Sequence, residues 1–227
     1  MIFKDVSGRI RYITEFYRKG GFYMYLFKYV MVMIVILSYF IGNHLPLTWG
    51  WENSPLEWSQ VATLLTGAVL CGKWRKEAKS AGRFQHARFF TWSIPLWLLM
   101  AGREMSWGRV FYPVGINAVT GPYFIPVSKL PYGPIVYPAI AIVIVTWLFA
   151  FTKHKLYTIP YELYQQDLFP IGEFLLIILS FVVSNIAEKQ LHYEIMEEIV
   201  ELVTYLSLLF TAYRVKVALQ HLTNRTN

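Results

Sequence analysis

The chain has 227 residues, of which 56% are hydrophobic, 18% aromatic and only 15% charged. An ordinary soluble domain is roughly 45–50% apolar and about 25% charged, so this composition excludes disorder and disfavours a water-soluble globule. The formal net charge is +7, but so apolar a chain lacks the clustered basic face that phosphate backbones require, and we predict no nucleic-acid partner. The single cysteine, Cys71, excludes an intramolecular disulfide and a thiolate zinc site.

Apolar stretches divide the chain into predicted membrane helices. Crossing a bilayer core of about 30 Å requires about 20 helical residues, and two charge-free runs meet that length. The first run follows a basic segment, but no small-residue cleavage site closes it, so we expect a retained helix rather than a signal peptide. The predicted spans are 22–42, 55–72, 88–105, 135–152, 171–188 and 195–213. The sequence therefore predicts an all-α, polytopic membrane helix bundle with about six transmembrane helices in one domain, 1–227.

The distribution of Lys and Arg orients this bundle, because short cytoplasmic loops are enriched in them. With both termini cytoplasmic (N-in/C-in), 17 of the 21 Lys and Arg residues lie inside. Eight of the 14 acidic residues lie on the other side: Glu52, Glu57, Glu104, Glu188, Glu194, Glu197, Glu198 and Glu201. The pattern predicts a multi-pass protein of the bacterial inner (cytoplasmic) membrane with an acidic periplasmic side.

Four of the six spans are short, and glutamates lie at their predicted periplasmic ends. Their charge-free stretches cover only about 18–22 Å of a core that is roughly 30 Å thick. An ionised carboxylate that faces lipid is costly, so such groups face the bundle interior, pair with a cation or line a wet cavity. We therefore predict a periplasm-facing, partly intramembrane carboxylate cluster.

Three candidate catalytic residues lie at the ends of two of these spans. Glu57 follows the predicted N-cap Ser54 at the start of the second span. Arg103 and Glu104 close the third span, in the densest polar motif of the chain. In the enzyme hypothesis, a glutamate in this set that binds no metal acts as a general base.

The last span and the turn before it supply further candidates. Glu198 and Glu201 continue a helical spacing that begins at Glu194, so they form one acidic stripe. His192 lies four residues after Glu188, which places both on one face if the turn is helical. The candidate metal ligands are Glu57, Glu104, His192, Glu198 and Glu201. Oxygen-rich sets favour Mg, Ca or Mn, and a histidine ligand also admits Zn.

A structural alternative for this acidic region stays open. The residues from Glu188 to Glu194 can form a solvated turn, and glutamates are favourable at the start of a helix because of its dipole. The dipole explains the first turn of the last helix but not Glu201. Glu173 lies apart from this acidic region and is predicted to be a solvated or interfacial side chain.

The segment 106–134 is rich in proline, glycine and aromatic residues and is long for a passive connection. It is predicted to be periplasmic, either as a cap or re-entrant cover over the cluster or as a surface loop anchored by its aromatic residues. Several reaction classes are excluded, because H-E-x-x-H, G-x-S-x-G, P-loop and dinucleotide-binding motifs are absent from the sequence.

Three motifs resemble a family of uncharacterised bacterial inner-membrane proteins. That family has an acidic-Gly/Ser-Pro-x-Glu-Trp motif, a Gly-Glu-Glu-x-Ser-Trp-Gly-Gln motif and a Glu-rich last helix. The matching residues here are Glu52, Ser54, Pro55, Glu57 and Trp58; Gly102, Glu104, Ser106, Trp107 and Gly108; and Glu197, Glu198 and Glu201. Arg103 and Arg109 stand where the family has Glu and Gln. The resemblance implies a membrane protein and no particular activity.

Three functions are compatible with these patterns. The leading hypothesis is a metal-dependent enzyme that acts on a lipid or lipid-linked substrate at the carboxylate cluster. The second is an ion- or proton-coupled transporter, because charged residues inside membranes also mark ion pathways. Against this hypothesis, the acidic cluster lies only on the predicted periplasmic side, which gives no path through the membrane. The third is a non-catalytic partner that docks another membrane protein through segment 106–134.

Overall fold

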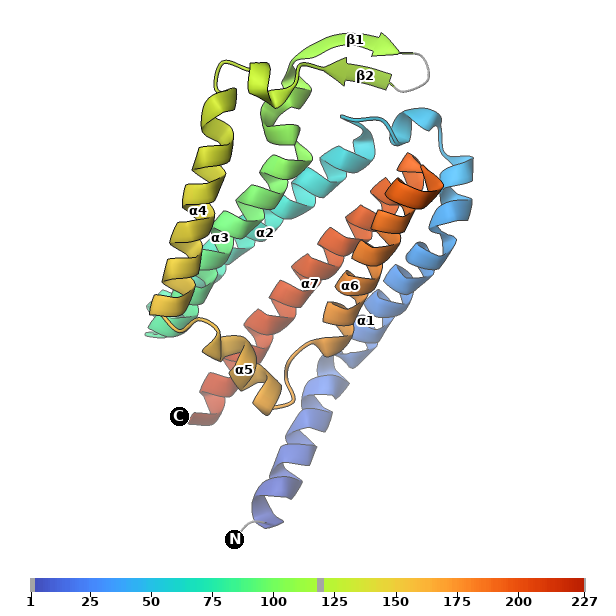
Figure 1. The fold of residues 1–227 in the computed structure, drawn as a ribbon. Helices are drawn as coiled ribbons and strands as arrows, with labels where there is room; N and C mark the ends of the chain where they lie inside the picture. Colours follow the sequence, from blue (N-terminus) through green and yellow to red (C-terminus); the bar gives the residue numbers. More distant parts are fainter. Residues whose placement is uncertain (1–2, 118–120, 227) are drawn as a thin grey trace.

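The computed structural model describes residues 3–117 and 121–226, with side chains for residues 24–117 and 121–222. It confirms the predicted all-helical class, with one short hairpin added (Figure 1). The helices are α1 (Phe3–His44), α2 (Pro55–Ser80), α3 (Phe84–Glu104), α4 (Gly133–Lys153), α5 (Thr158–Gln165), α6 (Ile171–Ile186) and α7 (Glu194–Thr226). Shorter segments are η1 (Leu47–Trp49), η2 (Ser106–Phe111), η3 (Val127–Lys129) and the π-helical turn η4 (Ala187–Leu191).

The bundle has two different ends (Figure 1). Strands β1 (Pro113–Asn117) and β2 (Gly121–Phe124) form an antiparallel hairpin beyond the end of α3, and we call this the hairpin end. Both chain termini, the α2–α3 turn and α5 lie at the opposite, terminal end. The starts of α2 and α7 and the end of α3 therefore meet near the hairpin end.

Within the described residues, three helical segments are long and apolar enough to cross a membrane: Met24–His44, Gly133–Lys153 and Ile171–Leu191. These segments are mostly exposed, as only 22%, 6% and 28% of their respective most apolar windows are buried in the protein. Their apolar faces are suited to contact lipid rather than a protein core. The more polar helices α2, α3 and α7 lie between them (Figure 1).

The sequence placed a cytoplasmic loop at 73–88, and most of it is helical. Helix α2 continues past the predicted end of its span as far as Ser80, because Lys, Arg and Glu are good helix formers in water. It stops where Gly82 adopts a left-handed conformation with φ 71°, and the amide of Arg83 bonds back to the carbonyl of Ala78. The change from apolar to basic residues after residue 72 therefore does not mark the end of the helix.

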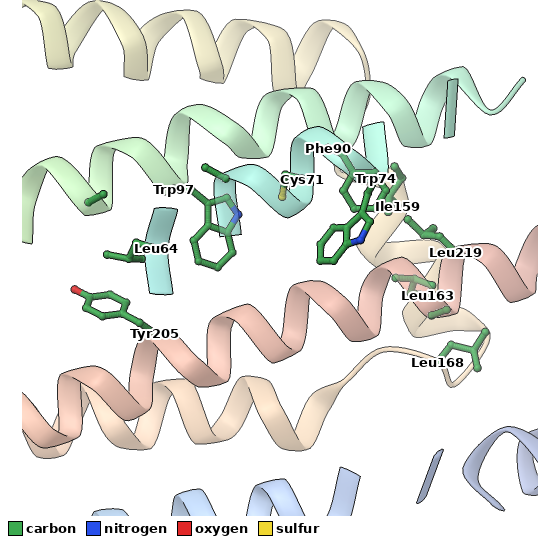
Figure 2. Close-up of a cluster of buried hydrophobic side chains, with 13 residues drawn as sticks. Leu64, Cys71, Trp74, Phe90, Trp97, Ile159, Leu163, Leu168, Tyr205 and Leu219 are labelled. Carbon is green, nitrogen blue, oxygen red and sulfur yellow. The ribbon is translucent and has the colours of Figure 1, made fainter. Parts of the chain in front are cut away.

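The main hydrophobic core joins α2, α3, α5 and α7 (Figure 2). Trp74 and Trp97 are each only 4% exposed and fill the space between these helices. Gly67 allows α2 and α3 to approach closely, because a side chain there would collide with the ring of Trp97. This packing fixes the register of α2, α3 and α7 and so positions the polar side chains at their hairpin ends.

Candidate functional site

Glu57 takes part in capping α2. The hydroxyl of Ser54 accepts a hydrogen bond of 3.3 Å from the amide of Glu57. The carboxylate of Glu57 in turn accepts a hydrogen bond from the amide of Asn53. This reciprocal arrangement is close to a capping box and holds the carboxylate at the start of the helix. Glu57 therefore lies where the sequence predicted, with a structural role as well as a candidate functional one.

At the end of α3, Arg103 and Glu104 form a network with α7. Nη1 of Arg103 donates to Oε1 of Glu104 and to the hydroxyl of Tyr205, both at 3.0 Å. Tyr205 donates to the same carboxylate oxygen of Glu104 at 2.7 Å. Nη2 of Arg103 lies 3.3 Å from Oε1 of Glu201. One guanidinium therefore links two carboxylates, and a phenol donates a hydrogen bond to one of them.

Glu198 is held by a residue that sequence reasoning missed. Nε2 of Gln60 donates to the carboxylate of Glu198 at 2.7 Å and to its backbone carbonyl at 3.0 Å. Gln60 is completely buried, and its Oε1 has no hydrogen-bond partner among the described residues. A buried amide oxygen without a donor is costly, so this position attracts a donor such as a water or a ligand. The sequence signal that could have indicated Gln60 is its polar side chain one helical turn after Glu57.

A tight turn after α3 attaches the loop to the start of α2. Ser106, Trp107 and Gly108 have consecutive positive φ angles of 45°, 56° and 85°. The turn brings the hydroxyl of Ser106 to 2.9 Å from Oε1 of Glu52, and Arg109 forms an ion pair with the same carboxylate. Positive φ at two non-glycine residues stores strain that surrounding contacts must offset.

We define the carboxylate cluster as the charged and polar side chains that α2, α3 and α7 bring together. Its members are Glu57, Gln60, Arg103, Glu104, Glu198, Glu201 and Tyr205. Glu198 lies close enough to the other three glutamates for their charges to repel one another. Within the described residues, Arg103 is the only cation in an ion pair with these four glutamates. The cluster therefore has an excess of carboxylates.

The structure does not add His192 to this cluster. His192 is exposed at the turn before α7, with φ 51°, and no hydrogen bond or ion pair joins it to the four glutamates in the described part of the chain. Among the described residues, no three His, Cys, Asp or Glu side chains are arranged to hold a metal ion. The glutamate oxygens bond instead to Gln60, Arg103 and Tyr205. A divalent cation at these residues stays a prediction.

A cavity of about 230 Å³ opens beside the cluster, between α3, α6 and α7. Its apolar wall consists of Met100, Ile177, Phe181 and Leu208. Its polar lining consists of Arg103, Ser184, Glu201, Thr204 and Tyr205. The cavity thus joins an apolar surface to three members of the carboxylate cluster, which suits a ligand with a charged group and an apolar chain.

The expected reading of Glu173 as solvated is wrong. Glu173 is 1% exposed near the start of α6, and Nη1 of Arg214 donates to its Oε1 at 2.6 Å. Nζ of Lys28 lies 3.9 Å from the same oxygen. The three residues come from α6, α7 and α1, so only the fold brings them together. We call them the Glu173 ion pairs.

No model of a known protein family matches the chain, and searches of curated proteins and of solved structures found no similar protein. The resemblance to an inner-membrane family therefore stays a prediction.

Proposed function

We propose that this chain is a six-helix protein of the bacterial inner membrane that binds a lipid or lipid-linked molecule at the carboxylate cluster. The observation that carries the proposal is the cavity whose apolar wall leads to Arg103, Glu201 and Tyr205. A polar head group fits the charged end, and the apolar wall can contact the part of an acyl chain next to it. The rest of the chain would lie outside this cavity of about 230 Å³, in the bilayer. The cavity lies among helices that the sequence predicts to be in the membrane, where such a molecule can enter from the bilayer.

The charges of the cluster specify the chemistry of the head group. The carboxylate excess favours a cationic group, and Arg103 favours an anionic group beside it because a guanidinium binds phosphate oxygens well. A zwitterionic phospholipid head group, such as phosphoethanolamine, carries both charges a short distance apart. Its ammonium would bind near Glu201 and Glu104, and its phosphate would bind Arg103.

The same groups could support hydrolysis or transfer on the bound molecule. Glu104 accepts hydrogen bonds from Tyr205 and from Arg103. A carboxylate that can act as a proton acceptor and a guanidinium that can stabilise an anion therefore occur together. In this enzymatic form of the proposal, Glu104, Glu57 and Arg103 are the candidate catalytic residues. The form with a bound Mg, Ca, Mn or Zn ion requires Glu57, Glu104, Glu198 and Glu201 to rearrange toward one point.

Native mass spectrometry of delipidated protein in detergent tests the binding. We expect phosphatidylethanolamine to bind more tightly than phosphatidylglycerol, which lacks the ammonium. Arg103→Gln and Glu201→Gln should each weaken that binding about tenfold, since a charge-assisted hydrogen bond contributes about 1.5–3 kcal/mol. The control is Glu194→Gln, because Glu194 is exposed on the same helix. Equal binding of phosphatidylethanolamine by wild type and the three variants contradicts the proposal.

Two further measurements test the catalytic forms of the proposal. Metal analysis of the same samples tests the metal-bound form, and a search for lipid products tests hydrolysis or transfer.

The proposed orientation has its own support and test. The basic segments 73–88, 153–155 and 214–216 belong to the ends of α2, α3, α4 and α7 that lie toward the terminal end (Figure 1). Such an excess of Lys and Arg is expected for a cytoplasmic face. The side chains of the basic N-terminal tail lie outside the described part of the chain: Lys4, Arg9, Arg11, Arg18 and Lys19. Since Cys71 is buried, single cysteines can be introduced. Ser128→Cys should react with an impermeant maleimide on spheroplasts, and Ser80→Cys only after lysis.

A second candidate, proton-coupled transport, is favoured by one observation. Glu173, predicted to be a solvated or interfacial side chain, is instead a buried carboxylate toward the terminal end of the bundle. Between it and the carboxylate cluster, α6 and α7 carry the buried Ser180 and Ser207, whose hydroxyls have no partner among the described residues. Proton flux into liposomes that is lost in both Glu173→Gln and Glu201→Gln supports transport, and flux no greater than in empty liposomes rejects it.

A further inference from the structure

A second polar cavity lies at the terminal end of the bundle, on the side opposite the carboxylate cluster. It has a volume of about 220 Å³ and lies between the end of α2, the start of α3 and the last part of α7. Its polar lining consists of Glu77, Arg83, His86, Lys216 and Gln220. Its apolar lining consists of Trp74, Ala78, Ala81, Phe90 and Leu219. We call it the terminal-end pocket.

Positive groups dominate this pocket. Arg83 and Lys216 both line it, and the single carboxylate, Glu77, is 41% exposed and lies 3.5 Å from the ammonium of Lys216. So exposed an ion pair contributes only about 0–1 kcal/mol, and Lys216 can therefore exchange it for a stronger anion at little cost. The pocket presents two cations, Arg83 and Lys216, to any anion that enters.

The backbone adds to the positive potential. Arg83 is the N-cap residue of α3, and its side chain makes no capping hydrogen bond because a guanidinium has no acceptor. The amide of Phe84 bonds to the carbonyl of Gly82, and the start of α3, from which Arg83 and His86 line the pocket, carries the positive end of the helix dipole without a side-chain cap. Phosphate groups bind well at such positions when cationic side chains lie beside them.

His86 completes the set of donors. It lies on the first turn of α3 and lines the pocket. Burial lowers the pKa of His86, and the positive charge of Arg83 lowers it further. The ring is therefore neutral at pH 7 and can donate one N–H without adding charge. Trp74 and Phe90, each 4% exposed, form the closed apolar floor beneath these groups.

We propose that the terminal-end pocket binds a phosphate group between Arg83, His86 and Lys216. The volume is smaller than the roughly 300–1,000 Å³ of pockets for drug-sized ligands, so it suits a phosphate or a small head group rather than a large molecule. The phosphate can come from a lipid head group or from a free phosphate compound. The proposal is independent of the lipid site at the hairpin end.

Binding is tested with the full-length protein, delipidated in a non-ionic detergent. Inorganic phosphate is titrated against sodium chloride of equal ionic strength, and hydrogen–deuterium exchange of residues 77–90 and the thermal midpoint are followed. In parallel, the protein is reconstituted in vesicles of phosphatidylcholine with or without phosphatidic acid. We expect slower exchange in this segment and a higher midpoint with at least one of the two phosphate sources.

Variants separate a specific site from general charge screening. Arg83→Gln should weaken binding about tenfold or more, as loss of an Arg–phosphate contact predicts. Lys216→Gln should do the same and Lys216→Arg should retain binding, which keeps the test decisive if Arg83→Gln does not fold. Arg75→Gln is the matched control, because Arg75 is exposed on α2 and does not line the pocket.

Each outcome decides the proposal. A response to inorganic phosphate that depends on Arg83 or Lys216 supports a free phosphate ligand. A response only to phosphatidic acid, with the same dependence, supports a lipid head group. The proposal is overturned if wild-type protein responds to neither source, or if the Gln variants respond as wild type does.

Discussion

The two buried charged groups of this bundle differ in how their charges are balanced. In the Glu173 ion pairs, one carboxylate that is 1% exposed meets two cations, Arg214 and Lys28. In the described part of the carboxylate cluster, two of the four glutamates form ion pairs with one cation, Arg103, whose side chain is 59% exposed. In the first group the negative charge of the carboxylate is balanced within the protein. The second has unbalanced negative charge and a cation that can reach a ligand.

This difference separates a structural role from a functional one. A buried charge with a complete set of partners is strongly destabilising to break but offers nothing to a ligand. An incomplete set of partners lowers the stability of the ligand-free protein, because like charges repel and a buried amide oxygen lacks a hydrogen-bond donor. A bound ligand can reduce the repulsion and supply the donor. Sites that sacrifice stability in this way are typical of binding and catalytic centres.

Removing the carboxylate of the balanced group should give the largest loss of stability. Glu173→Ala leaves the buried Arg214 without this carboxylate, and we expect the unfolding free energy to fall by about 3–5 kcal/mol. SDS-induced unfolding of the purified protein measures it. The control, Glu162→Ala, removes an exposed carboxylate from α5 and should change the free energy by less than about 0.5 kcal/mol.

The double variant Glu173→Gln with Arg214→Met sharpens the same measurement. Replacing both charges removes the uncompensated one, so we expect most of the stability lost in Glu173→Ala to return. If Glu173→Ala unfolds at the same SDS concentration as wild type, the Glu173 ion pairs do not stabilise the bundle and the comparison fails.

A smaller loss should follow from Tyr205→Phe in the carboxylate cluster. The change removes the 2.7 Å hydrogen bond to the buried Glu104 and the acceptor of a 3.0 Å hydrogen bond from Arg103, but leaves the contact between Arg103 and Glu104 in place. We expect a decrease of about 1–2 kcal/mol in the unfolding free energy, since one donor to a charged acceptor is lost. Thr204→Val, at the preceding position of α7, is the control for a lost hydroxyl. A loss as large as that of Glu173→Ala contradicts the distinction.

Sequence patterns gave the apolar helices well and the polar ones less well. The predicted spans 135–152 and 171–188 lie close to α4 and α6, because an uninterrupted apolar run has few alternatives to a helix in the membrane. The extension of α2 to Ser80 was missed, since a change from apolar to basic residues marks a change of solvent and not a helix end. The helix α5 and the hairpin, both short, gave no periodic signal.

The candidate site was predictable in its glutamates but not in their partners. Glu57 and Glu198 carry charge at a helix end, which is a visible anomaly in an apolar sequence. Gln60 and Tyr205 are neutral and are ordinary in a membrane helix, so only their positions one turn from a glutamate could have indicated them. Glu173 was misread because its partner Arg214 is 41 residues away and only the fold brings them together.

The smallest expected effect is that of Glu201→Gln. It distinguishes the carboxylate cluster from the Glu173 ion pairs most directly, because the same Glu→Gln substitution can be made in both. Glu201→Gln removes a 3.3 Å ion pair with the largely exposed Arg103, which contributes about 0–1 kcal/mol. It also removes the repulsion that Glu201 exerts on Glu57, Glu104 and Glu198, which acts in the opposite direction. We expect the unfolding free energy to stay within about 0.5 kcal/mol of wild type or to rise slightly, while Glu173→Gln lowers it. Unfolding of both variants in the same SDS titration provides the comparison. Equal losses of unfolding free energy in the two variants would show that the charges of the four glutamates are as well balanced as that of Glu173. The cluster would then have no excess of carboxylates available to bind a ligand.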